Sequence, residues 1–144
     1  MAKKDILFAF AEKSNIQLNL PQNGGLTVLT IPAFDASGFT VKLEAMAEVV
    51  VQNATPDYTV AMDIVLLRNG IDIARTSEVN VGNGLQYITT PNITWVDIPP
   101  PGTHTYELFI TISTNPFVDE RFVLTRALTA TLFPPDNVLP SVSN

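Results

Sequence analysis

Residues 58–81 read YTVAMDIVLLRNGIDIARTSEVNV, and this stretch decides the fold. Its centre, Asn69-Gly70, lies between two runs rich in apolar residues. Both central residues of a type I′ turn need positive φ, which asparagine and glycine tolerate, so this pair is a strong signal for a β-hairpin. We therefore predict one strand over 58–68 and a second over 71–81 that runs back beside it.

The first strand of this hairpin is largely apolar on both faces, apart from Asp63. Such a strand is covered on both faces, either inside one fold or by another subunit. The preceding stretch, 39–51, alternates between apolar and polar residues, and 103–113 does the same. This period of two is typical of half-buried strands.

Prolines and glycines separate the other apolar runs at the spacing of an all-β sandwich or barrel. These runs predict further short strands, and no window shows helical periodicity with caps. Pro32 is expected to end the first strand of the sandwich. The remaining strands are predicted over 26–31, 86–90, 92–98 and 121–133. Eight strands between Leu26 and Phe133 predict an all-β fold, a single eight-stranded jelly-roll sandwich of two four-stranded sheets.

The composition excludes several classes of function. The chain of 144 residues suits one domain and contains no cysteine, so thiol nucleophiles and thiolate metal sites are excluded. Eight basic and 14 acidic residues give a net charge of −6, so we expect no nucleic acid partner. Charged residues make up 15% of the chain, against about 25% in an ordinary soluble domain, which indicates that partners cover part of the surface.

The N-terminal stretch 3–13, KKDILFAFAEK, places six consecutive apolar residues near the start of the chain. A secretion signal has an uninterrupted positive region and a longer apolar region, whereas Asp5 interrupts the positive region here and Glu12 ends the apolar run early. No apolar run approaches the roughly 20 residues of a membrane span. We therefore expect no classical signal peptide and no membrane span.

Two interpretations of this segment remain. It is either the first strand of the chain's own sheet or a connector strand that adds to the open sheet edge of a neighbouring copy. The connector is favoured because a second apolar segment and a predicted hinge, Gly24-Gly25, precede the sandwich. The predicted subunit-connector residues are Ile6, Leu7, Phe8, Ala9 and Phe10. The predicted organisation is a connector and hinge over 1–24, a jelly-roll domain over 25–134 and a flexible tail over 135–144.

Candidate chemical sites are few. His104, the only histidine, lies among threonines and is predicted to be a surface residue, and Trp95 is predicted to be a core or corner residue. Asp119 and Glu120 are candidate calcium ligands, but acids beside Arg121 are more typical of a solvated loop. No nucleophile, base and orienting group can be assembled, so we expect no catalytic residues, no cofactor and no enzyme activity.

Three stretches carry a resemblance to a known family: LLRNG at 66–70, TWVDIPPPGTHTY at 94–106 and RALTA at 126–130. With them the sequence resembles the small jelly-roll domains of spore-surface proteins (exosporium and endospore appendage) and phage-fibre proteins of Gram-positive spore formers. Those domains are similar in fold to tumour-necrosis-factor and complement-type globular heads, which commonly form trimers. No collagen-like Gly-X-Y tract precedes the domain here, and the apolar N-terminus stands in its place.

The resemblance implies a structural, self-assembling subunit of a thin non-covalent surface fibre, similar to a spore appendage and joined through the N-terminal apolar strand. The alternative is a trimeric receptor- or glycan-binding head of a phage fibre. The expected partners are copies of the same chain, head to tail or as a trimer, with an anchoring or tip protein as a further partner. The expected location is the spore or cell surface, or a virion fibre in the alternative.

Overall fold

The computed structural model describes residues 7–53, 57–116 and 118–134, and every regular element in these ranges is a β-strand. The predicted all-β class is therefore confirmed. Ile6 and the predicted tail over 135–144 lie outside the described residues. The strands are β1 (Leu7–Lys13), β2 (Leu18–Asn19), β3 (Asn23–Asp35), β4 (Thr40–Asn53), β5 (Asp57–Arg68), β6 (Ile71–Asn83), β7 (Gln86–Thr89), β8 (Asn92–Asp97), β9 (Thr103–Thr114) and β10 (Val118–Phe133).

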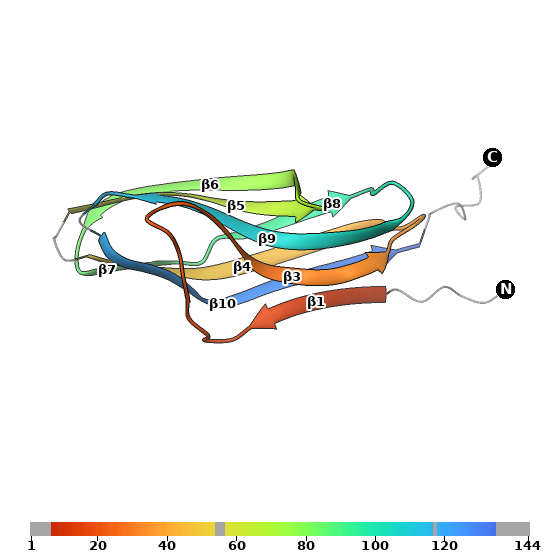
Figure 1. Ribbon diagram of the computed structural model, residues 1–144, viewed down its shortest axis with the longest axis horizontal. Helices are drawn as coiled ribbons and strands as arrows, with labels where there is room; N and C mark the ends of the chain where they lie inside the picture. The colour runs from red at the N-terminus through yellow and green to blue at the C-terminus, as the bar shows by residue number, and fades with distance from the viewer. Residues whose placement is uncertain (1–6, 54–56, 117, 135–144) are drawn as a thin grey trace, which may run out of the picture.

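These strands form two antiparallel sheets that pack against each other as a β-sandwich (Figure 1). In sheet A, β10 and β4 are the inner strands; β1 and β2 both pair with β10, and β7 and β8 both pair with β4. Sheet B has the order β3-β9-β5-β6. The edges of the sandwich are therefore β1 with β3 on one side and β6 with β8 on the other.

The prediction of eight strands is wrong, because the described chain has ten. Each of the eight predicted strands overlaps one strand between Asn23 and Phe133, but β1 and β2 come from the N-terminal segment. Both pair with the side of β10 that β4 leaves open, because backbone groups along that side need partners. The sheets consequently hold six and four strands, not four each.

The strand pairs are nested along the chain. β5 pairs with β6, β4 with β7 and β8, β3 with β9, and the first strands β1 and β2 with the last strand β10. The chain therefore follows one long hairpin whose two arms are folded over into two sheets. The hairpin between β5 and β6 lies at its tip.

The core lies between the sheets and follows the predicted alternation. In β4 the apolar face is buried, with Val41, Leu43 and Val49 at 0% exposure, and in β9 Tyr106 and Ile110 are likewise fully buried. A face that alternates in this way is covered by the opposite sheet.

The outer face of β5 is also partly buried within the single chain. Val65 is 0% exposed and lies in register between Phe109 of β9 and Arg75 of β6. Leu67, two residues further along the same face, is 8% exposed. The larger side chains of neighbouring strands flank this face, which accounts for a strand that is apolar on both faces.

The predicted hairpin turn is confirmed in its geometry. Asn69 and Gly70 have φ values of +52° and +80°, as a type I′ turn requires, and Arg68 pairs with Ile71. The Asn69 carbonyl oxygen Oδ1 accepts a hydrogen bond from the Thr105 backbone N–H at 2.9 Å. The turn is thereby attached to β9.

Strand β3 continues past the point where the sequence predicts its end. Pro32 was expected to stop the strand at Ile31, but β3 runs to Asp35, with a register shift between Ile31 and Phe34. Because β3 is an edge strand, a residue without a backbone N–H removes no ladder hydrogen bond on its open side. A proline there is compatible with the strand and marks a bulge.

We predict that Gly70→Val lowers the free energy of unfolding by about 1–2 kcal/mol, because a β-branched residue is strained at positive φ. Urea denaturation followed by circular dichroism measures the change. The matched control is Ile71→Val, which alters the adjacent, 70% exposed side chain and should shift stability by less than about 0.5 kcal/mol. Equal stability of Gly70→Val and the wild type would contradict the role assigned to the turn.

Candidate functional site

The predicted connector segment forms edge strand β1 of its own chain. Leu7 to Lys13 pair with Leu132 to Arg126 of β10 in an unbroken antiparallel register. Leu7, Phe8, Ala9 and Phe10 all lie in this strand, whereas Ile6 precedes the described residues. The connector role requires a second copy, so it stays a prediction.

The two faces of β1 differ in character. Ala9 and Ala11 are partly buried and pack against the core. Phe8 and Phe10 point to the outer face, where they are 67% and 58% exposed and their ring centroids lie 6.2 Å apart in a stacked arrangement. An exposed aromatic pair on an edge strand can be covered by a partner, which would remove apolar surface from water.

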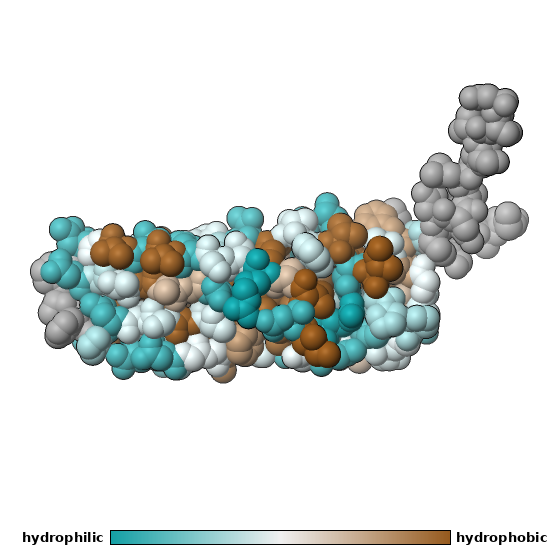
Figure 2. Space-filling view, turned by 90° about the horizontal axis from the view of Figure 1, so that it is seen from above, coloured by the Kyte–Doolittle hydropathy of each residue, from teal (hydrophilic) through white to brown (hydrophobic). Residues whose placement is uncertain are grey.

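Exposed apolar side chains follow the edges of the sandwich rather than its faces. Among the described residues, every large apolar side chain that is exposed lies in β1, β6, β7 or β8 or in the turns beside them, except Phe133 at the end of β10. Figure 2 looks onto the side along which β6 runs and shows separate hydrophobic groups among hydrophilic side chains. The edge residues are Leu7, Phe8, Phe10, Ile16, Ile71, Val79, Val81, Leu85, Ile88, Trp95, Val96 and Ile98.

The predicted hinge glycines lie inside a paired strand. Gly24 and Gly25 belong to β3 and pair with Ile112 and Thr111 of β9. Gly24 has φ of +142°, a conformation that L side chains rarely adopt. A hinge would require a second conformation of this segment, so the hinge role of Gly24 and Gly25 stays a prediction.

A buried carboxylate joins the two sheets near the hairpin turn. Asp97 of β8, 6% exposed, accepts hydrogen bonds from Arg68 Nη1 and from the Tyr106 hydroxyl, each at 2.6 Å. Burial, followed by the hydrogen bond to Asp97, raises the pKa of Tyr106, so its hydroxyl keeps the proton that it donates. The charge on Asp97 is paired, as buried charges must be, and the cluster fastens sheet A to sheet B.

The prediction that His104 is a surface residue is wrong. His104 is 6% exposed, its Nε2 lies 2.6 Å from the Pro100 carbonyl oxygen, and its Nδ1 lies 2.8 Å from Asn69 Nδ2. A carbonyl only accepts, so Nε2 carries the proton; the Asn69 amide nitrogen only donates, so Nδ1 accepts. His104 lies on the inward face of β9 with Tyr106, and its bond to Pro100 attaches the corner formed by the prolines after β8. Both ring nitrogens are engaged, so the residue holds this corner and offers no free base.

Arg126 is a buried residue that was not among the candidates predicted from the sequence. Its guanidinium donates hydrogen bonds to the carbonyl oxygens of Val28 at 2.9 Å, Ile16 at 2.7 Å and Leu124 at 2.8 Å. Burial lowers its pKa. These bonds attach the turn between β1 and β2 to sheet B. The signal in the sequence was its parity, because Arg126 shares the inward face of β10 with Leu128.

The remaining candidates are exposed. Asp119 and Glu120 lie exposed on β10, and no group of three or more potential metal ligands occurs among the described residues. Trp95, predicted to be a core or corner residue, is 44% exposed at the edge formed by β8. The described residues include no helix of the length and apolarity needed to span a membrane.

The sandwich is similar to parts of solved viral proteins. The VP2 subviral particle of infectious bursal disease virus matches with a TM-score of 0.55 and 14% identity, over 88% of this chain and 32% of that one. A D431N mutant VP2 in T=1 particles matches with a TM-score of 0.51 and 16% identity, over 90% of this chain and 32% of that one. The T13 viral particle of the same virus matches with a TM-score of 0.50 and 14% identity, over 88% of this chain and 30% of that one.

The chain spans about a third of the length of these proteins. At such low identity the likeness concerns the fold alone. No protein-family model and no curated protein sequence matches the chain.

We predict that His104→Ala lowers the free energy of unfolding by about 1–3 kcal/mol, because the Asn69 amide and the Pro100 carbonyl lose a buried hydrogen-bond partner. Chemical denaturation measures this loss. Thr103→Ala alters the exposed neighbouring residue and serves as the control, with an expected change below about 0.5 kcal/mol. If both variants unfold at the wild-type midpoint, the two hydrogen bonds contribute nothing to the corner.

Proposed function

We propose that the protein is a structural subunit that assembles with copies of itself through the apolar side chains of its edge strands. The observation that carries this proposal is the distribution of exposed apolar residues, which among the described residues concentrate on β1, β6, β7 and β8. Edge strands present unpaired backbone groups, and monomeric proteins protect them with charges or short length. Apolar side chains beside such edges favour association.

We infer that the sandwich is a jelly roll. β1 and β2 share one position beside β10, and β7 and β8 share one beside β4, so ten strands fill eight positions, four in each sheet. The nested pairing of first with last strand, folded over into two sheets, supports this topology. The similarity to VP2 particles supports the broader class of structural β-sandwich.

The finer proposal is a thin non-covalent fibre joined through the N-terminal strand. Phe8 and Phe10 would contact a different surface of the next copy, and such heterologous contacts produce filaments when they do not close. Burying two phenylalanines contributes about 3–6 kcal/mol before ordering costs. A contact of that size, repeated at each junction, supports an extended assembly at the spore or cell surface.

The second candidate is a trimeric receptor- or glycan-binding head on a virion fibre. It is favoured by one observation, a shallow depression with an aromatic rim on the outer face of sheet B. If this second candidate is correct, the protein forms a closed assembly of defined size instead of a filament. An anchoring or tip protein is a further proposed partner in both cases.

We predict that the wild type is oligomeric at micromolar concentration and that the double variant Phe8→Ser/Phe10→Ser is not. Removing both rings exposes no core, because the alanines of β1 face inward, so the variant should keep its β-type circular dichroism. Analytical ultracentrifugation measures the mass, and negative-stain microscopy separates filaments from closed trimers.

The control is Lys42→Ala/Glu44→Ala, which removes an exposed ion pair from inner strand β4 and should leave assembly unchanged. A monodisperse wild-type monomer would refute both candidates. Assembly of the phenylalanine variant at wild-type strength would refute the contact through β1.

A further inference from the structure

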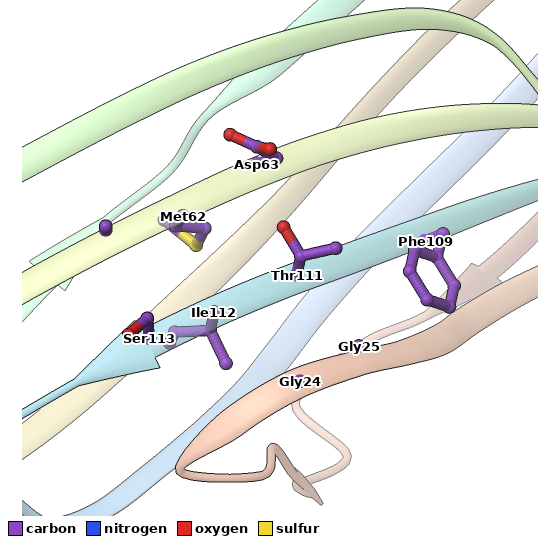
Figure 3. Close-up of a pocket in the computed structure, with 9 residues that line it drawn as sticks. Gly24, Gly25, Met62, Asp63, Phe109, Thr111, Ile112 and Ser113 are labelled. Atoms are coloured by element: carbon purple, nitrogen blue, oxygen red, sulfur yellow. The ribbon is translucent and has the colours of Figure 1, made fainter.

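The outer face of sheet B carries a shallow depression of about 370 Å³ (Figure 3). The aromatic pair on β1 belongs to the other sheet. The strand register explains the shape of the depression. Outward positions in the two rows beside Phe109 hold glycine or short side chains, so the Phe109 ring is the largest outward side chain that lines the depression. The outward residues that line it are Gly25, Ala61, Asp63, Phe109, Thr111 and Ser113.

The ring of Phe109 occupies the space of the side chain that Gly25 lacks. A Cβ atom at Gly25 would lie 2.3 Å from Cζ and 2.5 Å from Cε1 of this ring. Gly25 is not one of the glycines with positive φ, so space for the ring, rather than the backbone conformation, requires glycine here. The ring reaches from β9 towards β3, as Figure 3 shows, and stays partly exposed at the rim of the depression.

Polar groups are fixed beside this ring. Ser77 Oγ donates to Asp63 Oδ1 at 2.6 Å and Arg75 Nη1 donates to Asp63 Oδ2 at 2.5 Å. The hydrogen bond from Ser77 and then the contact with Arg75 lower the pKa of Asp63, so the carboxylate is ionised at neutral pH. The Thr111 hydroxyl lies on the same side as Asp63, in the row that joins them across β9 and β5 (Figure 3).

We propose that this depression binds one neutral pyranose residue of a saccharide. The C–H groups on one face of a pyranose ring carry a small positive charge and pack on the negative face of an aromatic ring. Its hydroxyl groups can donate to the Asp63 carboxylate and to the hydroxyl oxygens of Thr111 and Ser113. The Ser113 hydroxyl itself donates to Asn23 Oδ1 at 2.8 Å, so towards a ligand it acts as an acceptor. A few polar groups that converge beside an apolar wall are typical of ligand sites.

The negative charge of the depression disfavours anionic small ligands. A phosphate, sulfate or sialic acid would meet the Asp63 carboxylate, and the guanidinium of Arg75 is already paired with both Asp63 and Asp72. The net charge of −6 adds to the repulsion. A saccharide site in this depression would serve the second candidate function, the glycan-binding head, and the proposal rests on that candidate. It does not depend on self-assembly of the subunit.

The test is saturation-transfer difference NMR on the full chain with the methyl glycosides of glucose, galactose, mannose and N-acetylglucosamine, and with N-acetylneuraminic acid as the anionic probe. We expect transfer to the ring C–H protons of at least one neutral glycoside and none to the anionic probe. Phe109→Ala and Asp63→Asn should each weaken the affinity at least about tenfold. The control, Phe8→Ala, removes a more exposed phenylalanine from the other sheet and should bind the neutral glycoside as the wild type does.

The Phe109 ring also packs against Gly25, so Phe109→Ala could reduce binding by destabilising the fold instead of by removing a ligand contact. If Phe109→Ala does not fold, Asp63→Asn and Thr111→Val test the polar side of the depression alone. Absence of transfer to all neutral glycosides overturns the proposal, as does wild-type affinity in folded Phe109→Ala or in both polar variants. Sedimentation of the same samples reports assembly separately, so failure here is distinguishable from failure of the proposed subunit role.

Discussion

The hydrogen-bonded turn at Asn69-Gly70 is the constraint on which the rest of the sandwich depends. It sets the register of β5 on β6, and every other strand pair lies outside this one along the chain. Asn69 also exchanges backbone and side-chain hydrogen bonds with Thr105, each at 2.9 Å, and its amide reaches His104. A single residue with positive φ therefore positions the strands on both sides of β5, and the Asp97 cluster then fastens the second sheet to the same end.

The strands between Asn23 and Phe133 could be predicted because each leaves a local signal. The alternation in 39–51 and in 103–113 follows directly from strands with one buried and one outer face. The turn between 68 and 71 is Asn-Gly, a pair that is typical of a type I′ hairpin turn because both residues tolerate positive φ. Such signals do not depend on knowing what lies next to the strand. Apart from the hairpin of β5 and β6, they describe each strand but not which strands are neighbours.

The place of the N-terminal segment could not be predicted, because it depends on the partner and not on the strand itself. An apolar stretch suits any open edge, and the edge of β10 in the same chain offers the same backbone groups as the edge of another copy. The roles of His104 and Gly25 were missed for a similar reason. Each depends on a group distant in sequence, the Asn69 amide for His104 and the Phe109 ring for Gly25.

The nested pairing has a consequence for how the chain acquires its structure. Sheet A pairs β1 with β10 and is therefore incomplete until β10 has been synthesised, whereas sheet B is complete once β9 has been made. Pairings between distant segments are slow to form because long loops must close first. During that delay the apolar strands and their open edges are available to other nascent chains. Folding and association are thus competing reactions of the same surfaces, and their relative rates set the yield of correctly folded subunits.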